Sequence, residues 1–190
     1  MPWPFRRLWH QARSLNGEIG EIKVEPIVEM PEMAAYGVDP TTWSGLPWSW
    51  ASERLVANRN YWVVTVSPEG QPHSLPVWGA WLTGRHVFVF SCAHSSAKLR
   101  HLVANPRVSI TGSDTVECIS VQGRATVLGP DDSDVDVFIG DCVAKYGAEV
   151  PGDLAEFLRA GAVVRVQPTV AFGVIEREAE FATRATRWRF

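Results

Sequence analysis

The stretch SCAHSSAKLRHLVANPRVSI, residues 91–110, predicts the end of a strand, a helix and a second strand in quick succession. Ser95 or Ser96 can cap the helix, and Pro106 ends it. The start of a helix carries unpaired backbone N–H groups and a partial positive charge. The stretch therefore favours an anion-binding site where the first strand crosses into the helix.

Two cations stand in the first turn of this predicted helix, Lys98 and Arg100. The helix dipole disfavours positive charge there, so their position is better explained if an anion lies nearby. The alternative is that both side chains simply point into water, and spacing alone does not separate the two interpretations. His101, in the same helix, is expected on its exposed surface. The expected apolar face consists of Leu99, Leu102 and Val103.

Alternating and apolar segments on both sides of this helix predict a protein built mainly from strands. Ser49 or Ser52 can cap an early helix, and Gly123 predicts a bulge within a strand. Six or more strands around two or three helices predict a mainly β fold with flanking helices, closed or half-closed as a barrel. The expected strands cover residues 61–66, 71–82, 86–91, 107–112, 116–129, 162–176 and 185–190. The expected helices cover residues 50–58, 130–147 and 153–160.

Composition restricts the classes of function. With 190 residues, 46% of them hydrophobic and 21% charged, the chain is expected to form an ordinary globular domain. A net charge of -3 argues against a general nucleic-acid binder, and no apolar run approaches the roughly 20 residues of a transmembrane helix. Three widely spaced cysteines fit a reduced cytoplasm, so a cytoplasmic location is expected.

No sequence pattern indicates a nucleophile paired with a base, and no spacing indicates a metal site. We therefore predict no catalytic side chains and no metal ligands. If the protein is an enzyme, a bound cofactor is expected to carry out the chemistry.

The sequence predicts two parts, an N-terminal extension of residues 1–50 and a main domain of residues 51–190. The extension contains a helix and a loop rich in Trp and Pro. Apolar residues recur on one face of residues 5–15, which indicates a helix that packs on the protein. The alternative is a basic helix on a membrane surface, which would make residues 3–15 a peripheral membrane contact.

Four stretches in this order resemble the flavin-binding split β-barrel superfamily. That superfamily includes the pyridoxamine 5'-phosphate oxidases and the actinobacterial flavin/deazaflavin oxidoreductases. The pattern is most similar to the branch that binds coenzyme F420, and it spans about residues 40–190. The four stretches are RNYWVVTVSPEGQPHSLPVWGAWL, HVFVFSCAHSSAKLRHLVANPRVSI, VQGRATVLG and TRWRF. The resemblance implies a split β-barrel of the FMN-binding, pyridoxamine 5'-phosphate oxidase-like type.

The resemblance also implies a phosphate site at the helix start. Ser96 and Lys98 would contact the cofactor phosphate, Ser91 and Ser95 would add hydroxyl groups, and Arg100 would assist.

The rest of the cofactor would lie along a strand and against a second subunit. Pro76, Val77 and Trp78 would pass along the ring and offer backbone groups to its polar edge. Arg187 and Trp188 would reach the site from the other subunit, because such barrels resemble homodimers with the cofactor at the interface.

This chain departs from the pyridoxamine phosphate oxidases in two places. Their Arg and Lys are missing from the strand SLPVWG, and Ala97 stands where they have an arginine between the serine and the lysine. The departures argue against vitamin B6 chemistry and weaken FMN binding. The tail of coenzyme F420 could still gain affinity from scattered arginines. The candidates are Arg54, Arg59, Arg124 and Arg184.

The sequence thus leaves four functions open, one of which gives the barrel no ligand and makes residues 1–50 a partner-binding module; the other three involve a cofactor. The first is an oxidoreductase that transfers a hydride between coenzyme F420 and a small unsaturated organic substrate. The second is an FMN-binding oxidase or reductase of the same fold. The third is a protein that binds the cofactor without catalysis.

Overall fold

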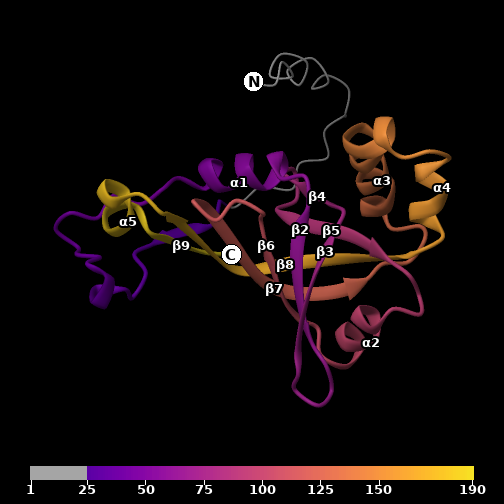
Figure 1. Cartoon of the computed structure of the whole chain (residues 1–190), viewed down its shortest axis with the longest axis horizontal. Coiled ribbons are helices and arrows are strands. Elements are labelled where there is room, and N and C mark those ends of the chain that lie inside the picture. The colour runs from indigo at the N-terminus through magenta and orange to yellow at the C-terminus, as the bar shows by residue number, and fades with distance from the viewer. Residues whose placement is uncertain (1–24) are drawn as a thin grey trace.

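The computed structural model describes residues 25–190 (Figure 1). Its strands form one antiparallel sheet with helices around it, which confirms the predicted mainly β class. The strands are β1 (Ile27–Glu29), β2 (Tyr61–Val66), β3 (Pro72–Val77), β4 (Gly79–Leu82), β5 (Val87–Cys92), β6 (Arg107–Thr111), β7 (Glu117–Val127), β8 (Ala162–Ile175) and β9 (Thr186–Arg189). The helices are α1 (Trp48–Ala57), α2 (Ala97–Ala104), α3 (Ser133–Tyr146), α4 (Leu154–Arg159) and α5 (Glu178–Arg184), with 3-10 turns at Ala34–Tyr36 and Gly147–Glu149.

The sheet curls into a barrel whose two end strands, β3 and β4, do not pair with each other. Pairing runs from β3 through β2, β6, β7 and β8 to β5 and β4. The segment predicted as one strand over residues 71–82 is in fact two strands, because the chain bends at Trp78. β3 pairs with β2 and β4 pairs with β5, so this bend carries the chain across the opening of the barrel.

Strand β8 joins the barrel to a smaller side lobe. One edge of β8 pairs with β7 along its length, and the other edge pairs first with β5 and then with β9. Where β7 crosses β8, the register shifts between Gln122 and Gly123, which confirms the predicted bulge. A Cβ atom at Gly123 would lie 2.3 Å from the carbonyl oxygen of Gln167, so the close approach of the strands requires glycine.

Two hydrophobic cores lie on opposite faces of β5. Phe88 and Phe90 point into the barrel, whereas Val87 and Val89 point outward beneath α3. Burial on both faces explains why this strand is continuously apolar rather than alternating. The strand thereby fixes α3 and α4 against the barrel wall.

Residues 25–50, the described part of the predicted N-terminal extension, pack on the rest of the chain. β1 pairs with β9, and the indole of Trp43 donates to the carbonyl of Ala185 at 2.7 Å. Helix α1 spans the predicted domain boundary between residues 50 and 51. Pro47 is its N-cap residue, so the predicted cap by Ser49 or Ser52 is wrong. The predicted helix at 5–15 lies outside the described residues.

The sequence patterns missed two elements of the side lobe, β1 and α5. Both are short and stand next to β9 in Figure 1. Among residues 25–190, no helix has the length and apolar character that a membrane crossing requires.

Candidate cofactor site

The start of α2 is built as the sequence predicts, with Ser96 as the cap. Its hydroxyl oxygen accepts from the backbone N–H of Leu99 at 3.2 Å. Ser95 is exposed, and its carbonyl accepts from the guanidinium of Arg100 at 2.9 Å. Arg100 therefore folds back toward the helix start, where its charge adds to that of the helix dipole.

Lys98 is a half-buried cation without a carboxylate partner. Its ammonium group has no hydrogen bond or ion pair within residues 25–190. Burial lowers its pKa, and the Cys92 thiol only partly opposes this shift. A bound anion would restore the favourable solvation that the ammonium has lost, so the site fits a phosphate group.

The inner face of α2 explains why Lys98 is partly buried. His101 and Leu102 follow it by three and four residues, and both are buried against the barrel. The expected surface position of His101 is therefore wrong, since the residue is 6% exposed. Its Nδ1 lies 3.1 Å from the Thr65 hydroxyl. Val103, expected on the apolar face, is exposed instead.

The hydroxyl of Ser91 forms a hydrogen bond with helix α4. It donates to the carbonyl of Leu158 at 3.2 Å, which joins β5 to α4. A Cβ atom at Gly161 would lie 2.4 Å from this hydroxyl, so the surroundings are tight. Ser91 therefore links β5 to α4 in this structure, and its predicted phosphate contact stays a prediction.

The three predicted ring-binding residues lie together. Pro76, Val77 and Trp78, with Asn60, line a shallow depression of about 360 Å³. The Trp78 ring stacks on Tyr146 with centroids 5.1 Å apart and an interplanar angle of 16°. The Trp78 indole therefore forms an aromatic part of the lining, and its stacking on Tyr146 of α3 holds it in place.

Hydrogen bonds of Tyr146 fix the bend at Trp78. The Tyr146 hydroxyl accepts from the backbone N–H of Gly79 at 3.3 Å and donates to the carbonyl of Arg59. Burial raises the pKa of Tyr146 to about 12, so the hydroxyl keeps its proton. Beside it, Lys145 donates to the Tyr61 hydroxyl at 3.1 Å, and burial lowers the pKa of Lys145 to about 8.

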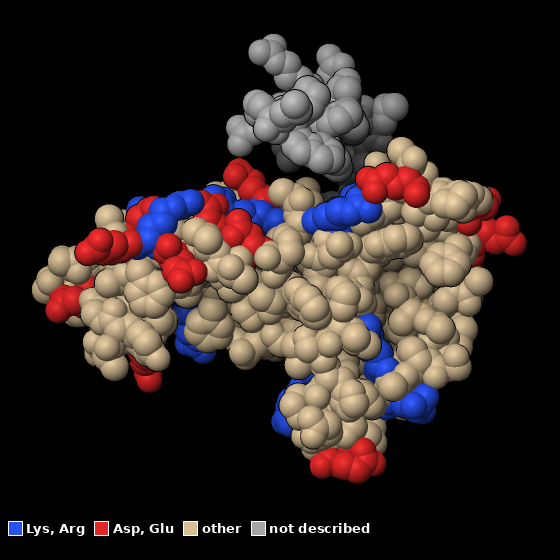
Figure 2. Space-filling view, viewed as in Figure 1, with Lys and Arg blue, Asp and Glu red and all other residues tan. Residues whose placement is uncertain are grey.

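Strand β3 connects the depression with α2. His73 pairs with Thr65, where α2 packs, and Val77 pairs with Tyr61. Four residues of strand separate the two positions by roughly 13 Å. Among the described strands, β3 pairs only with β2, so its other edge keeps backbone groups that none of these strands occupies. Figure 2 shows Lys and Arg side chains on both sides of the lower projection that the β2–β3 hairpin and α2 form.

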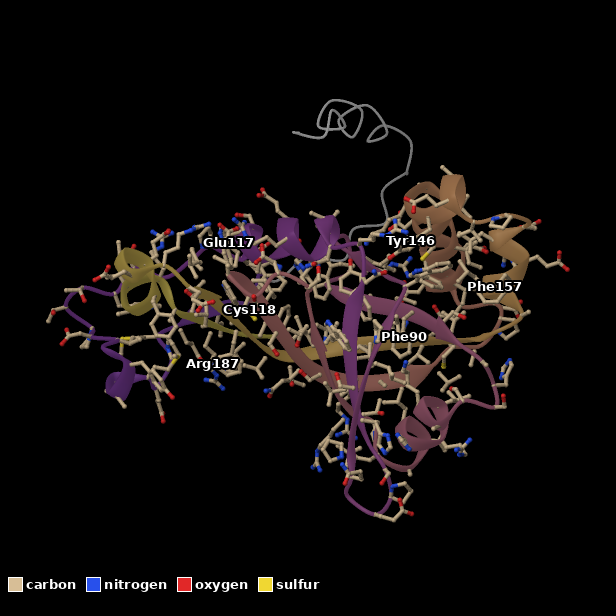
Figure 3. All side chains as sticks on the ribbon, in the orientation of Figure 1. Phe90, Glu117, Cys118, Tyr146, Phe157 and Arg187 are labelled. Carbon is tan, nitrogen blue, oxygen red and sulfur yellow. The ribbon has the colours of Figure 1, made fainter. Side chains whose placement is uncertain are left out.

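The C-terminal residues do not join this site within one chain. Trp188 is 0% exposed, and its indole donates to the carbonyl of Leu46 at 3.2 Å, so its ring belongs to the core and not to a ligand surface. The Arg187 guanidinium contacts Glu29 at 2.5 Å. In Figure 3, Arg187 lies in the side lobe, whereas Tyr146 lies on the other side of the molecule, at the end of α3. An Arg187 contact with the cofactor therefore requires a second subunit.

The four arginines considered for an anionic tail differ in their partners. Arg54 is paired with Glu117, and Arg59 with Glu149. Arg124 is exposed and Arg184 is half-buried, and neither has an ion pair within the described part of the chain.

The family model described as pyridoxamine 5'-phosphate oxidase matches residues 51–175, well over half of the chain. The chain belongs to this family, and the split-barrel fold expected from the sequence is confirmed. No curated protein matches the chain significantly.

Solved structures with the same fold bind different ligands, according to their names. An F420 reductase is 25% identical with a TM-score of 0.50, over 63% of this chain and 94% of that one. A FAD-binding protein from Mesorhizobium loti is 18% identical with a TM-score of 0.53, over 76% and 96%. The heme storage protein HutZ from Vibrio cholerae is 17% identical with a TM-score of 0.51, over 62% and 87%. The last two show the fold alone.

Proposed function

We propose that the protein is an oxidoreductase that binds coenzyme F420 across α2 and β3 and transfers a hydride between it and a small unsaturated organic substrate. The observation that carries this proposal is Lys98, a half-buried cation with no carboxylate partner at a helix start. Burying an unpaired charge is costly, and a phosphate at this position would compensate the cost. The similarity to an F420 reductase supports the choice of cofactor.

Each part of the site has a physical role in this proposal. Ser96, Lys98 and the first backbone N–H groups of α2 bind the phosphate, and Arg100 assists only through its charge, from the exposed side of the helix start. The free edge of β3 offers backbone groups to the polar edge of the ring, and Trp78 supplies an apolar wall. When bound, the coenzyme supplies the hydride chemistry, while the protein orients the reactants and excludes water.

FMN is the alternative cofactor. The same phosphate site serves it, but β3 has the sequence PHSLPV and carries no Lys or Arg to strengthen binding. A third alternative is a protein that binds the cofactor without turnover.

We also propose that a second copy of the chain completes the site. Cross-strand pairing aligns Trp62, Thr111, Ser120, Phe172 and Arg187 in one row on the outer face of the sheet. Trp62 is 46% exposed at one end of this row, and small hydroxyl side chains make its middle flat. Such a face suits a homodimer, which would bring Arg187 toward the partner's cofactor.

The experiment is a set of fluorescence titrations of the purified protein with coenzyme F420, FMN and hemin, followed by light scattering to measure mass. Micromolar or tighter F420 binding with much weaker FMN binding is expected. Preference for FMN or hemin, or no binding of F420, would contradict the proposal. Oxidation of the reduced coenzyme by added unsaturated substrates separates an enzyme from a binding protein.

A further inference from the structure

Two arginines face each other directly on the outer side of the sheet. Arg107 begins β6 and pairs in register with Arg124 of β7. Both are exposed, and neither guanidinium has a hydrogen bond or ion pair within residues 25–190. Directly opposed residues of antiparallel strands have Cβ atoms about 5 Å apart, and like charges at such positions repel each other.

The surrounding strands offer no carboxylate to neutralise this pair. From β2 to β8, the described strands contain one acidic residue, Glu117, at the far end of β7 from Arg124. Glu117 is already paired with Arg54 and Arg177. The next side chain in the row is Gln167 of β8, which is neutral. The repulsion is therefore left for a ligand to relieve.

The position of the pair relates it to the phosphate site. Lys98 lies in the first turn of α2 and Arg107 follows the end of the helix by three residues, and the helix from Lys98 to Ala104 spans roughly 9 Å. A ligand with a phosphate at one end of α2 and further anionic groups on a flexible chain can reach both sites. FMN, with its single phosphate, cannot occupy both.

We propose that Arg107 and Arg124 form a second anion site that binds an oligoanionic chain through paired guanidinium forks. Guanidinium groups bind carboxylates and phosphates through two parallel hydrogen bonds, so two adjacent forks suit neighbouring anionic groups. The chain belongs either to the tail of the cofactor or to an anionic substrate. Assignment to the cofactor rests on the proposed function, whereas the anion site itself does not.

The first experiment tests the site without any cofactor. Calorimetric titration with tripolyphosphate and with tetraglutamate compares the wild-type protein, the double variant R107Q/R124Q and the control Arg159→Gln. Arg159 is an exposed arginine of α4 that pairs with Asp136. The double variant is expected to bind at least tenfold more weakly, and the control to bind like the wild type. Equal binding by the double variant, or no binding by the wild type, would overturn the proposal.

If Arg107 and Arg124 served only folding or subunit contact, the double variant would change in stability or oligomeric state rather than in anion affinity. Because removing the repulsion cannot weaken the fold, the double variant is expected to unfold at the same temperature as the wild type or higher. A lower unfolding temperature, or a changed oligomeric state with unchanged anion affinity, would show that the arginines serve folding or subunit contact and would overturn the proposal.

The second experiment identifies the source of the chain. The double variant is expected to lose about five- to fiftyfold in affinity for coenzyme F420 and less than twofold for FMN. An equal loss of affinity for coenzyme F420 and for FMN would mean that the two arginines act on the phosphate that both cofactors carry. That result would contradict a second anion site. If the wild type binds tripolyphosphate but neither cofactor, the proposed function fails while the anion site stands, and an anionic substrate is its ligand.

Discussion

Replacing Lys98 with methionine separates a ligand contact from a structural role. Methionine keeps an unbranched side chain of similar length and removes the charge. In the wild-type protein, burial lowers the pKa of Lys98 because its ammonium group has no carboxylate partner. The charge therefore opposes folding of the free protein, and the variant is expected to be at least as stable as the wild type.

The same substitution is expected to weaken cofactor binding. A charge-assisted hydrogen bond to phosphate contributes about 1.5–3 kcal/mol, which corresponds to roughly 10- to 150-fold in the dissociation constant. Quenching of tryptophan fluorescence by coenzyme F420 measures this constant, and urea denaturation measures the stability of the free protein.

Arg100→Met is the matched control in the same helical turn. Arg100 is exposed and already donates to the carbonyl of Ser95, so its loss is expected to change affinity by less than about fivefold. The reasoning is refuted if Lys98→Met binds the coenzyme as tightly as the wild type does. It is equally refuted if the variant is clearly less stable, because Lys98 would then support the fold rather than a ligand.

Three further substitutions test the framework of the site by urea denaturation. Trp188→Ala is expected to lower the free energy of unfolding by about 3–5 kcal/mol, and a small loss would mean that its ring is not a core element. Tyr146→Phe is expected to cost about 1–3 kcal/mol, because the Gly79 N–H and the Arg59 carbonyl lose their partner; an unchanged midpoint would discount these bonds. The pKa of Lys145 is about 8 in the folded protein and 10.5 in the unfolded chain. Between these two pH values the unfolded chain therefore binds more protons than the folded protein does. The wild type should therefore gain stability relative to Lys145→Met between about pH 7.5 and about pH 9.5, and a flat or falling difference would contradict this.

The parts of the fold that depend on local pattern could be predicted from the sequence. Alternation over residues 61–66 and Gly123 in a long strand indicate a strand and a bulge that the structure contains. Strand β1 has only three residues and exists because it pairs with β9, far away in the sequence. No local pattern reports such a partner. The bend at Trp78 escaped prediction for the same reason, since Tyr146 of α3 holds it.

The candidate site shows the same division. The cap by Ser96 and the run of Pro76, Val77 and Trp78 follow from neighbouring residues and were predicted correctly as a cap and as neighbours on one surface. His101 was expected on the surface and is buried, because its ring contacts the hydroxyl of Thr65 on a remote strand. The partner of the Ser91 hydroxyl, the carbonyl of Leu158 in a remote helix, was not predicted either. Whether a polar side chain is free for a ligand is decided by partners that sequence spacing does not reveal.

The contacts between residues 46–48 and the C-terminal residues 188–190 have a consequence for biosynthesis. The indole of Trp188 donates to the carbonyl of Leu46, and Phe190 packs against Trp48 at a centroid distance of 4.9 Å. A ribosome makes these partners more than a hundred residues apart, so the Trp48 ring stays uncovered until β9 and Phe190 have been synthesised. Domains with such late contacts fold slowly and expose apolar surface in the meantime. Nascent chains stalled before β9 should therefore recruit chaperones, whereas chains that include β9 and Phe190 should not.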